Sequence, residues 1–134
     1  MNKKLLLTIV ILFTLIPLNV KADESNTNIY GEPYKIRCTC YTAPQDAITS
    51  SGQKVREGII AGKPELEGCT AVIYENNNGK VGNIIGLFEV LDTGGKPIKN
   101  GKVIDVFRDT LDGCNEWIAD HGDYVFVQII PGVG

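Results

Sequence analysis

Two aspartates, Asp92 and Asp105, lie in or beside apolar, strand-like segments of this 134-residue sequence. Asp92 follows the run LFEVL and opens DTGG (92–95), whose glycines would let the chain turn and a ligand approach closely. Asp105 lies inside KVIDVF, where strand alternation puts it on the same face as Phe107. A partly buried carboxyl near a second acid has a raised pKa, which a general acid at neutral pH requires.

Each of these acids also has a simpler explanation, as do the two other conspicuous side chains. An Asp followed by Gly is common in turns, and a charge within a strand can protect a sheet edge from aggregation. His121, the only His, lies in ADHGDY with no Ser or Cys motif nearby, so a catalytic triad has little support. Trp117, the only Trp, is expected to anchor the core, with stacking on a sugar as the alternative.

The N-terminal segment 1–22 has the pattern of a secretory signal peptide. Lys3 and Lys4 precede an apolar stretch, and Val20-Lys21-Ala22 resembles a cleavage site. The stretch is short for a membrane span, which needs about 20 apolar residues, although an uncleaved anchor is the alternative. We expect secretion to the cell exterior or wall, and no membrane association after cleavage.

The charge of the mature chain argues against a nucleic-acid partner. Removing Lys3, Lys4 and Lys21 from the 13 basic residues leaves 10 against 16 acidic ones, a net charge of about −6. Nucleic acid selects clustered Lys and Arg, which this chain lacks. Roughly 110 residues form one domain with a modest core, which we expect to be monomeric.

Four cysteines remain in the mature chain: Cys38, Cys40, Cys69 and Cys114. Small exported domains often carry disulfides, and we expect two here. Cys38 and Cys40 would share one face of a strand, where a mutual bond is strained, so each is expected to pair with Cys69 or Cys114. A structural zinc and free thiols are the alternatives, but the spacing lacks paired C-x₂₋₄-C hooks.

The remaining pattern predicts a mainly β domain at 34–134 behind a flexible polar leader at 23–33. Asn78-Gly79 is typical of a hairpin turn, and Gly82 and Gly86 suggest bulges. A single short helix is expected at about 114–119. Six or seven short strands with frequent turns favour a compact β-barrel. We expect strands at 34–41, 58–62, 69–75, 81–92, 102–107 and 123–130.

The order of several short motifs resembles the three-Asp domain. That domain is the C-terminal catalytic region of membrane-bound lytic transglycosylase A and of small muralytic or resuscitation-associated proteins of Gram-positive bacteria. The resemblance runs from about Ile36 to Ile130. The matching pieces are Tyr41-Thr42, Thr49, Ser51, Gly52, GIIAG (58–62), Pro64, Gly68, Thr70, AVIYE (71–75), DTGG (92–95), IK (98–99), IDVF (104–107), Gly122 and YVFVQI (124–129).

The resemblance implies a double-psi β-barrel that cleaves peptidoglycan glycan strands between N-acetylmuramic acid and N-acetylglucosamine. It implies Asp105 as general acid and base, with Asp92 in support, and no cofactor or metal. It also implies substrate-binding roles for Tyr41, Thr93, Gly94 and Lys99.

Lys63 stands where the resembled domain has its first Asp, and the segment between Asp92 and Asp105 is about two residues longer. A lytic transglycosylase needs no activated water, because the sugar's own 6-hydroxyl attacks, so one carboxyl can serve as acid and then base. A wall-binding domain without turnover is the alternative. An aspartic peptidase is a further one, but Gly95 replaces its usual Ser or Thr, and its second acid would require a homodimer.

Overall fold

The computed structural model of this protein describes residues 31–132. The expected signal peptide (1–22) and residues 23–30 of the expected leader lie outside the described residues. Within the described range, no helix is both long and apolar enough to cross a membrane.

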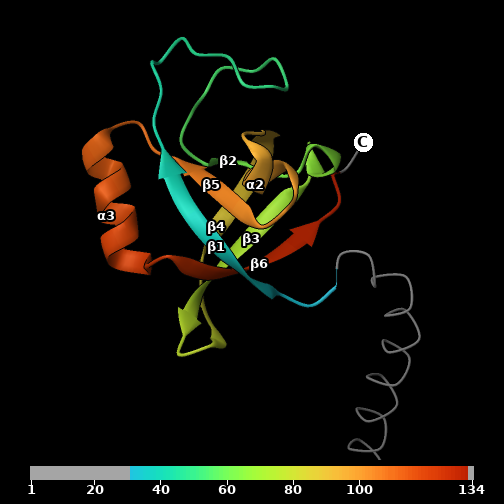
Figure 1. The fold of residues 1–134 in the computed structure, drawn as a ribbon, viewed down its shortest axis with the longest axis vertical. Helices are drawn as coiled ribbons and strands as arrows, with labels where there is room; N and C mark the ends of the chain where they lie inside the picture. Colours follow the sequence, from blue (N-terminus) through green and yellow to red (C-terminus); the bar gives the residue numbers. More distant parts are fainter. Residues whose placement is uncertain (1–30, 133–134) are drawn as a thin grey trace, which may run out of the picture. The chain divides into compact units, whose positions relative to one another are not determined.

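Six strands close into a barrel in the order β1-β5-β2-β4-β3-β6 (Figure 1). β1 pairs in parallel with β5 and β2 with β4, while the other neighbours are antiparallel. The prediction of a mainly β barrel of six or seven strands is therefore confirmed. The strands are β1 (Tyr34–Tyr41), β2 (Ile59–Ala61), β3 (Thr70–Asn77), β4 (Lys80–Asp92), β5 (Val103–Phe107) and β6 (Tyr124–Ile130).

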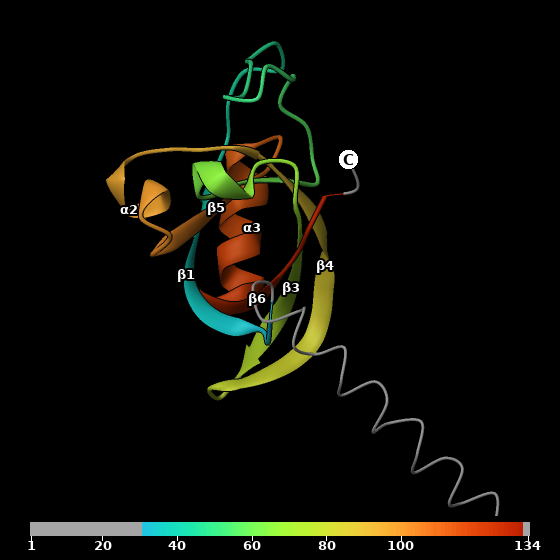
Figure 2. The same cartoon turned by 90° about the vertical axis from the view of Figure 1, so that its right-hand side faces the viewer.

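β3 and β4 form the long hairpin whose turn the sequence predicts (Figure 2). Asn78 and Gly79 both have positive φ, 53° and 85°, as a two-residue turn of this kind requires. The ladder is irregular between Ile73 and Asn76, opposite the stretch of β4 that contains Gly82 and Gly86. These irregularities agree with the bulges expected from the two glycines.

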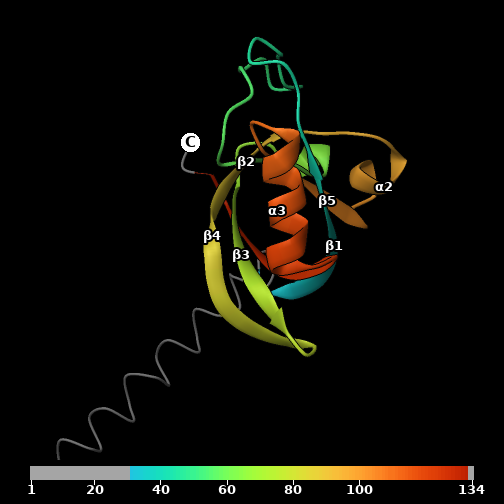
Figure 3. The same ribbon diagram turned by 90° about the vertical axis from the view of Figure 1, so that its left-hand side faces the viewer.

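The predicted helix is α3 (Leu111–His121), which is longer at both ends than expected. Thr110 caps it by accepting a hydrogen bond from the Gly113 backbone N–H, and it ends at Gly122, whose φ of 75° suits glycine. α3 packs alongside β1 (Figure 3). Trp117 is only 5% exposed and meets Phe88 of β4 edge-to-face at 5.7 Å, so it anchors the core and offers no surface to a sugar.

Two short helical turns were not predicted. η1 (Pro64–Leu66) follows β2, and α2 (Lys96–Lys99) lies in the connection between β4 and β5. Elements this short carry no hydrophobic periodicity, so only their prolines marked them. A side chain on Gly94 would run into Ile98 of α2, so glycine at position 94 lets this turn fold back onto the chain before it.

The loop 42–58 is held against the barrel by a small apolar cluster of its own. Val55 from this loop packs with Ile59, Leu91 and Phe107, and Tyr41 lies against the same cluster. Inside the loop, Thr49 is buried and its backbone is bonded to Gln53. The cluster fixes the loop beside the ends of β1, β4 and β5; Asp92 is the last residue of β4, and Asp105 lies two residues before the end of β5.

The prediction of two disulfides is wrong for this structure, in which all four cysteines are free thiols. The backbone N–H of Cys38 donates a hydrogen bond to the carbonyl of Asp123, just before β6 begins. Cys69 instead adjoins Thr70, which pairs with Ile130 at the other end of β6. The length of β6 therefore separates Cys69 from Cys38 and Cys40 by about 20 Å, far beyond disulfide reach. Cys114 lies on α3, where, besides burial, it helps to raise the pKa of the Cys40 thiol, but the two cysteines are not bonded covalently.

Candidate active site

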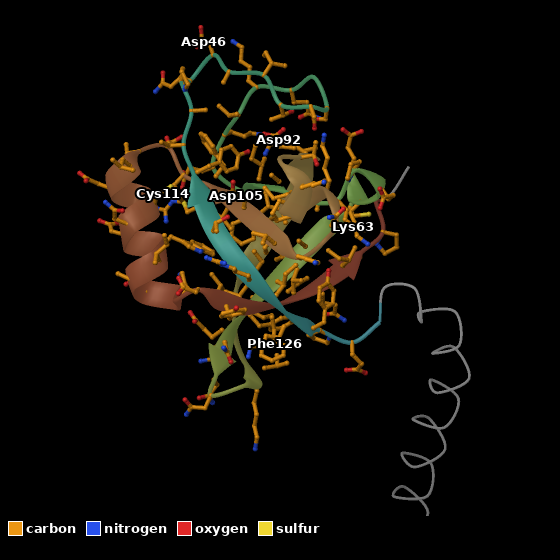
Figure 4. All side chains as sticks on the ribbon, in the orientation of Figure 1. Asp46, Lys63, Asp92, Asp105, Cys114 and Phe126 are labelled. Carbon is orange, nitrogen blue, oxygen red and sulfur yellow. The ribbon has the colours of Figure 1, made fainter. Side chains whose placement is uncertain are left out.

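Asp92 and Asp105 are aligned by the strand between them. Ala61 on β2 is the register partner of Asp105 on β5 and also of Asp92 on β4. A bulge in the β2–β4 pairing skips Leu91, so that Asp92 reaches this level. With strands spaced about 4.8 Å apart, the two Cα atoms are about 10 Å apart on the same rung. In Figure 4, Asp92 is labelled just below the loop that carries Asp46, and Asp105 is labelled below Asp92, beside β1.

Both oxygens of the Asp92 carboxylate are occupied by hydrogen bonds. Oδ1 accepts from the backbone N–H groups of Ser50 and Thr93, at 3.0 and 2.9 Å. Oδ2 accepts from the Tyr41 hydroxyl at 2.9 Å. These three donors come from three different segments, so they hold the carboxylate in one orientation.

Tyr41 is a stable donor in this arrangement. Burial, its hydrogen bond to Asp92 and the nearby charge of Asp105 all raise the pKa of the Tyr41 phenol far above its ordinary value. The hydroxyl therefore keeps its proton throughout the neutral range. Tyr41, for which a substrate-binding role is predicted, is thus hydrogen-bonded to one of the two acids.

Asp105 has a different environment. Its Oδ1 accepts a hydrogen bond from the Thr39 hydroxyl at 3.0 Å, while no residue in 31–132 bonds to Oδ2. Partial burial raises the pKa of the Asp105 carboxyl. The hydrogen bond from Thr39 lowers this pKa, and the charge of the nearby Asp92 raises it. A raised pKa and an unoccupied oxygen are the two properties that a carboxylic acid needs to donate a proton near neutral pH.

The two acids therefore differ in what they can do. Asp92 is engaged on both oxygens and is suited to orient its neighbours and to supply negative charge. Asp105 keeps one oxygen unbonded within residues 31–132 and holds a proton more readily than an exposed Asp does. Pairs of carboxyls whose environments differ in this way are typical of acid and base catalysis.

The other predicted site residues lie in the connection after β4. Thr93 gives its backbone N–H to Asp92, while its hydroxyl is buried without a partner among the described residues. Gly94 lies against Ile98, and Lys99 is exposed on α2. These residues share one surface segment with Asp92, but none of their side chains bonds to either acid within the described part of the chain.

Lys63 forms no ion pair with Asp105 within residues 31–132. Its aliphatic stem lies across Gly101, where any side chain would collide with it. The pKa of Asp105 is set by burial, Thr39 and Asp92, with no contribution from Lys63. Lys63 therefore packs on the connection between β4 and β5.

His121 lies away from the two acids. It is the last residue of α3, its Nδ1 is 2.6 Å from Glu75 Oε1, and its ring packs on Trp117. It thus ties the end of the helix to β3 and takes no part in the acidic site. No group of three or more potential metal ligands occurs within residues 31–132.

Two contributors to the site, Thr39 and Ser50, were not predicted. Thr39 is two positions before Tyr41, so strand alternation alone would have put both on the face that meets the acids. Ser50 contributes only a backbone N–H, which leaves no signal in the residue type.

Comparison with known proteins identifies no relative: no protein-family model matches this chain, and no curated protein sequence does.

Proposed function

We propose that this protein cleaves the glycan strands of peptidoglycan in the manner of a lytic transglycosylase, with Asp105 as its acid and base. One observation carries this proposal: Asp105 has a raised pKa and an Oδ2 without a hydrogen-bond partner among the described residues, next to an Asp92 whose oxygens are both occupied. The ordered resemblance to the three-Asp domain supplies the substrate class.

The proposed reaction uses the same carboxyl twice. Asp105 donates its proton to the oxygen that joins N-acetylmuramic acid to N-acetylglucosamine, and the bond from the muramic anomeric carbon to that oxygen breaks. The 6-hydroxyl of the same muramic acid then attacks this carbon and gives its proton to Asp105. The products are an anhydromuramyl end and a free hydroxyl on N-acetylglucosamine, and Asp105 is protonated again.

Asp92 supports this step without transferring a proton. Its negative charge near Asp105 favours the protonated acid and would stabilise positive charge that develops on the sugar. The engagement of both Asp92 oxygens also argues against an aspartic peptidase, in which two acids share one proton.

We also infer that the protein acts outside the cell, because its substrate lies there and because residues 1–22 have the pattern of a signal peptide. Peptidoglycan is the proposed partner, and the mature chain is proposed to act as a monomer.

The direct test is incubation of the purified mature protein with isolated peptidoglycan, followed by mass analysis of the soluble fragments. Anhydromuramyl products are expected. Reducing-end products would indicate hydrolysis instead. Saturable binding without any release would favour a wall-binding domain in which the site no longer turns over.

A further inference from the structure

Thr39 lies directly across from Asp105, because the two are register partners on the parallel strands β1 and β5. The Thr39 Oγ1 atom is 3.0 Å from Asp105 Oδ1 and 3.4 Å from the backbone carbonyl oxygen of Ile104. A hydroxyl has one hydrogen to donate, and the shorter of these contacts is to the carboxyl. The pair is set by backbone register and not by flexible side chains.

We propose that Thr39 is a positioning residue for Asp105. The Thr39 hydroxyl occupies Oδ1 of the carboxyl, and so Oδ2 is the oxygen that carries and transfers the proton. This inference depends on the proposed function for its catalytic meaning. Its structural content, a hydroxyl that selects one carboxyl oxygen, can be measured without turnover.

The selection matters because one carboxyl is used in both steps. If Oδ2 gives the proton to the glycosidic oxygen, the same Oδ2 is free to take the proton from the 6-hydroxyl, since Oδ1 stays bonded to Thr39. The carboxyl need not rotate between the steps. Removing the Thr39 hydroxyl would free both oxygens and let the carboxyl turn about its own bond.

Thr39 also keeps Asp105 able to act as a base. Burial and the charge of Asp92 raise the pKa of Asp105, and the Thr39 hydrogen bond opposes them by favouring the ionised form. The other titratable groups whose pKa the charge of Asp105 affects are Tyr41, Cys38 and Cys40 on β1, all with pKa values raised by burial and therefore neutral near pH 7. Asp92 is thus the charged neighbour, and Thr39 the hydrogen-bonding one.

The test compares Thr39→Val, which keeps the shape and loses the hydroxyl, with Thr39→Ser, which keeps the hydroxyl. Thr70→Val is the matched control, because Thr70 is also a strand threonine but makes no side-chain hydrogen bond within the described residues. Thr39→Ala is a second variant in case valine disturbs the strand. Carbon-13 NMR of labelled aspartate carboxyls, assigned with Asp105→Asn, follows the titration of Asp105 in each protein.

In Thr39→Val and Thr39→Ala, the Asp105 titration is expected to move to higher pH, while Thr39→Ser and Thr70→Val titrate as the wild type does. On peptidoglycan, kcat of Thr39→Val should fall about tenfold or more, since hydrogen bonds to charged groups are among the stronger ones, and its pH profile should move in the same direction as the NMR titration.

An unchanged Asp105 titration in both Thr39→Val and Thr39→Ala would overturn the inference, whether or not the wild type cleaves the wall. A shifted titration in a protein that releases no fragments would instead leave the role of Thr39 in place and remove the proposed function.

Discussion

The hydroxyl of Tyr41 donates a hydrogen bond to Asp92 Oδ2 over 2.9 Å and so joins the end of β1 to the end of β4. These strands are not neighbours, because β5 and β2 lie between them in the barrel. Tyr41 also packs edge-to-face on Phe107, at 5.4 Å, and belongs to the cluster beneath the loop 42–58. One side chain thereby holds the carboxylate, the loop and the strand ends in a fixed relation.

Replacing Tyr41 by Phe keeps the ring contacts and removes this hydrogen bond. We expect a loss of about 1–2 kcal/mol in the free energy of unfolding, because a partly buried carboxylate loses one of its three donors. Denaturant titration would measure it. Tyr124→Phe is the control, since Tyr124 is exposed and its ring contact with Lys35 does not need the hydroxyl. Equal stability of Tyr41→Phe and the wild type would mean that the bond does not stabilise the fold.

Replacing Asp105 by Asn removes the transferable proton and keeps the size of the side chain. Release of anhydromuramyl fragments should fall by at least the roughly 10²–10⁴-fold that general acid catalysis contributes, while binding to the wall persists. Asp92→Asn should cost less, because its role is to orient and to supply charge. The control is Asp46→Asn, an exposed acid in the loop 42–58 (Figure 4). Fragment release that survives Asp105→Asn would remove Asp105 from the mechanism.

Replacing Asp105 by Asn should also change how the stability of the protein depends on pH. The pKa of Asp105 is raised in the folded protein, so its contribution to stability is fully present below the unfolded value of about 3.9 and is lost as pH rises through the folded pKa. Asn does not titrate. The Tm of Asp105→Asn minus that of the wild type should therefore increase from about pH 3.5 to pH 7. A difference that is constant with pH, in melts followed by circular dichroism, would contradict the raised pKa.

The number of reactive thiols distinguishes free cysteines from disulfides. Titration of the unfolded, unreduced protein should find four thiols. In the native state Cys38 and Cys40 should react slowly, because burial raises the pKa of Cys38 to about 12 and also raises the pKa of the less buried Cys40, which leaves little thiolate near pH 7. Two thiols or none in the unfolded, unreduced protein would show that the chain forms disulfides in solution.

The N-terminal expectation can be checked by intact mass. Cleavage after Ala22 would leave a mature chain that begins at Asp23. An exported protein that retains the apolar stretch before Ala22 would instead be a membrane-anchored form.

Much of the barrel could be predicted from local pattern. Strand alternation, the Asn78-Gly79 turn and the apolar run before Asp92 mark every strand to within a few residues, because these signals come from neighbours along the chain. Asp105 could also be identified from its neighbours along the chain, because a charged carboxyl is unusual inside an apolar strand. The prediction of disulfides failed because the number of cysteines says nothing about how far apart they lie in the folded chain.

The arrangement of the site was decided only by the tertiary structure. Asp92 and Asp105 become neighbours because β2 enters between their strands and because a bulge beside Ala61 advances Asp92 by one position. Thr39 faces Asp105 because β1 and β5 pair in parallel in one particular register. Register depends on how strands distant in sequence pack together, and a shift of one residue would turn every side chain to the opposite face. The sequence by itself therefore determined which acids and which strands this protein has. The closed barrel decided that, within residues 31–132, Asp92 is bonded on both oxygens and Asp105 on only one.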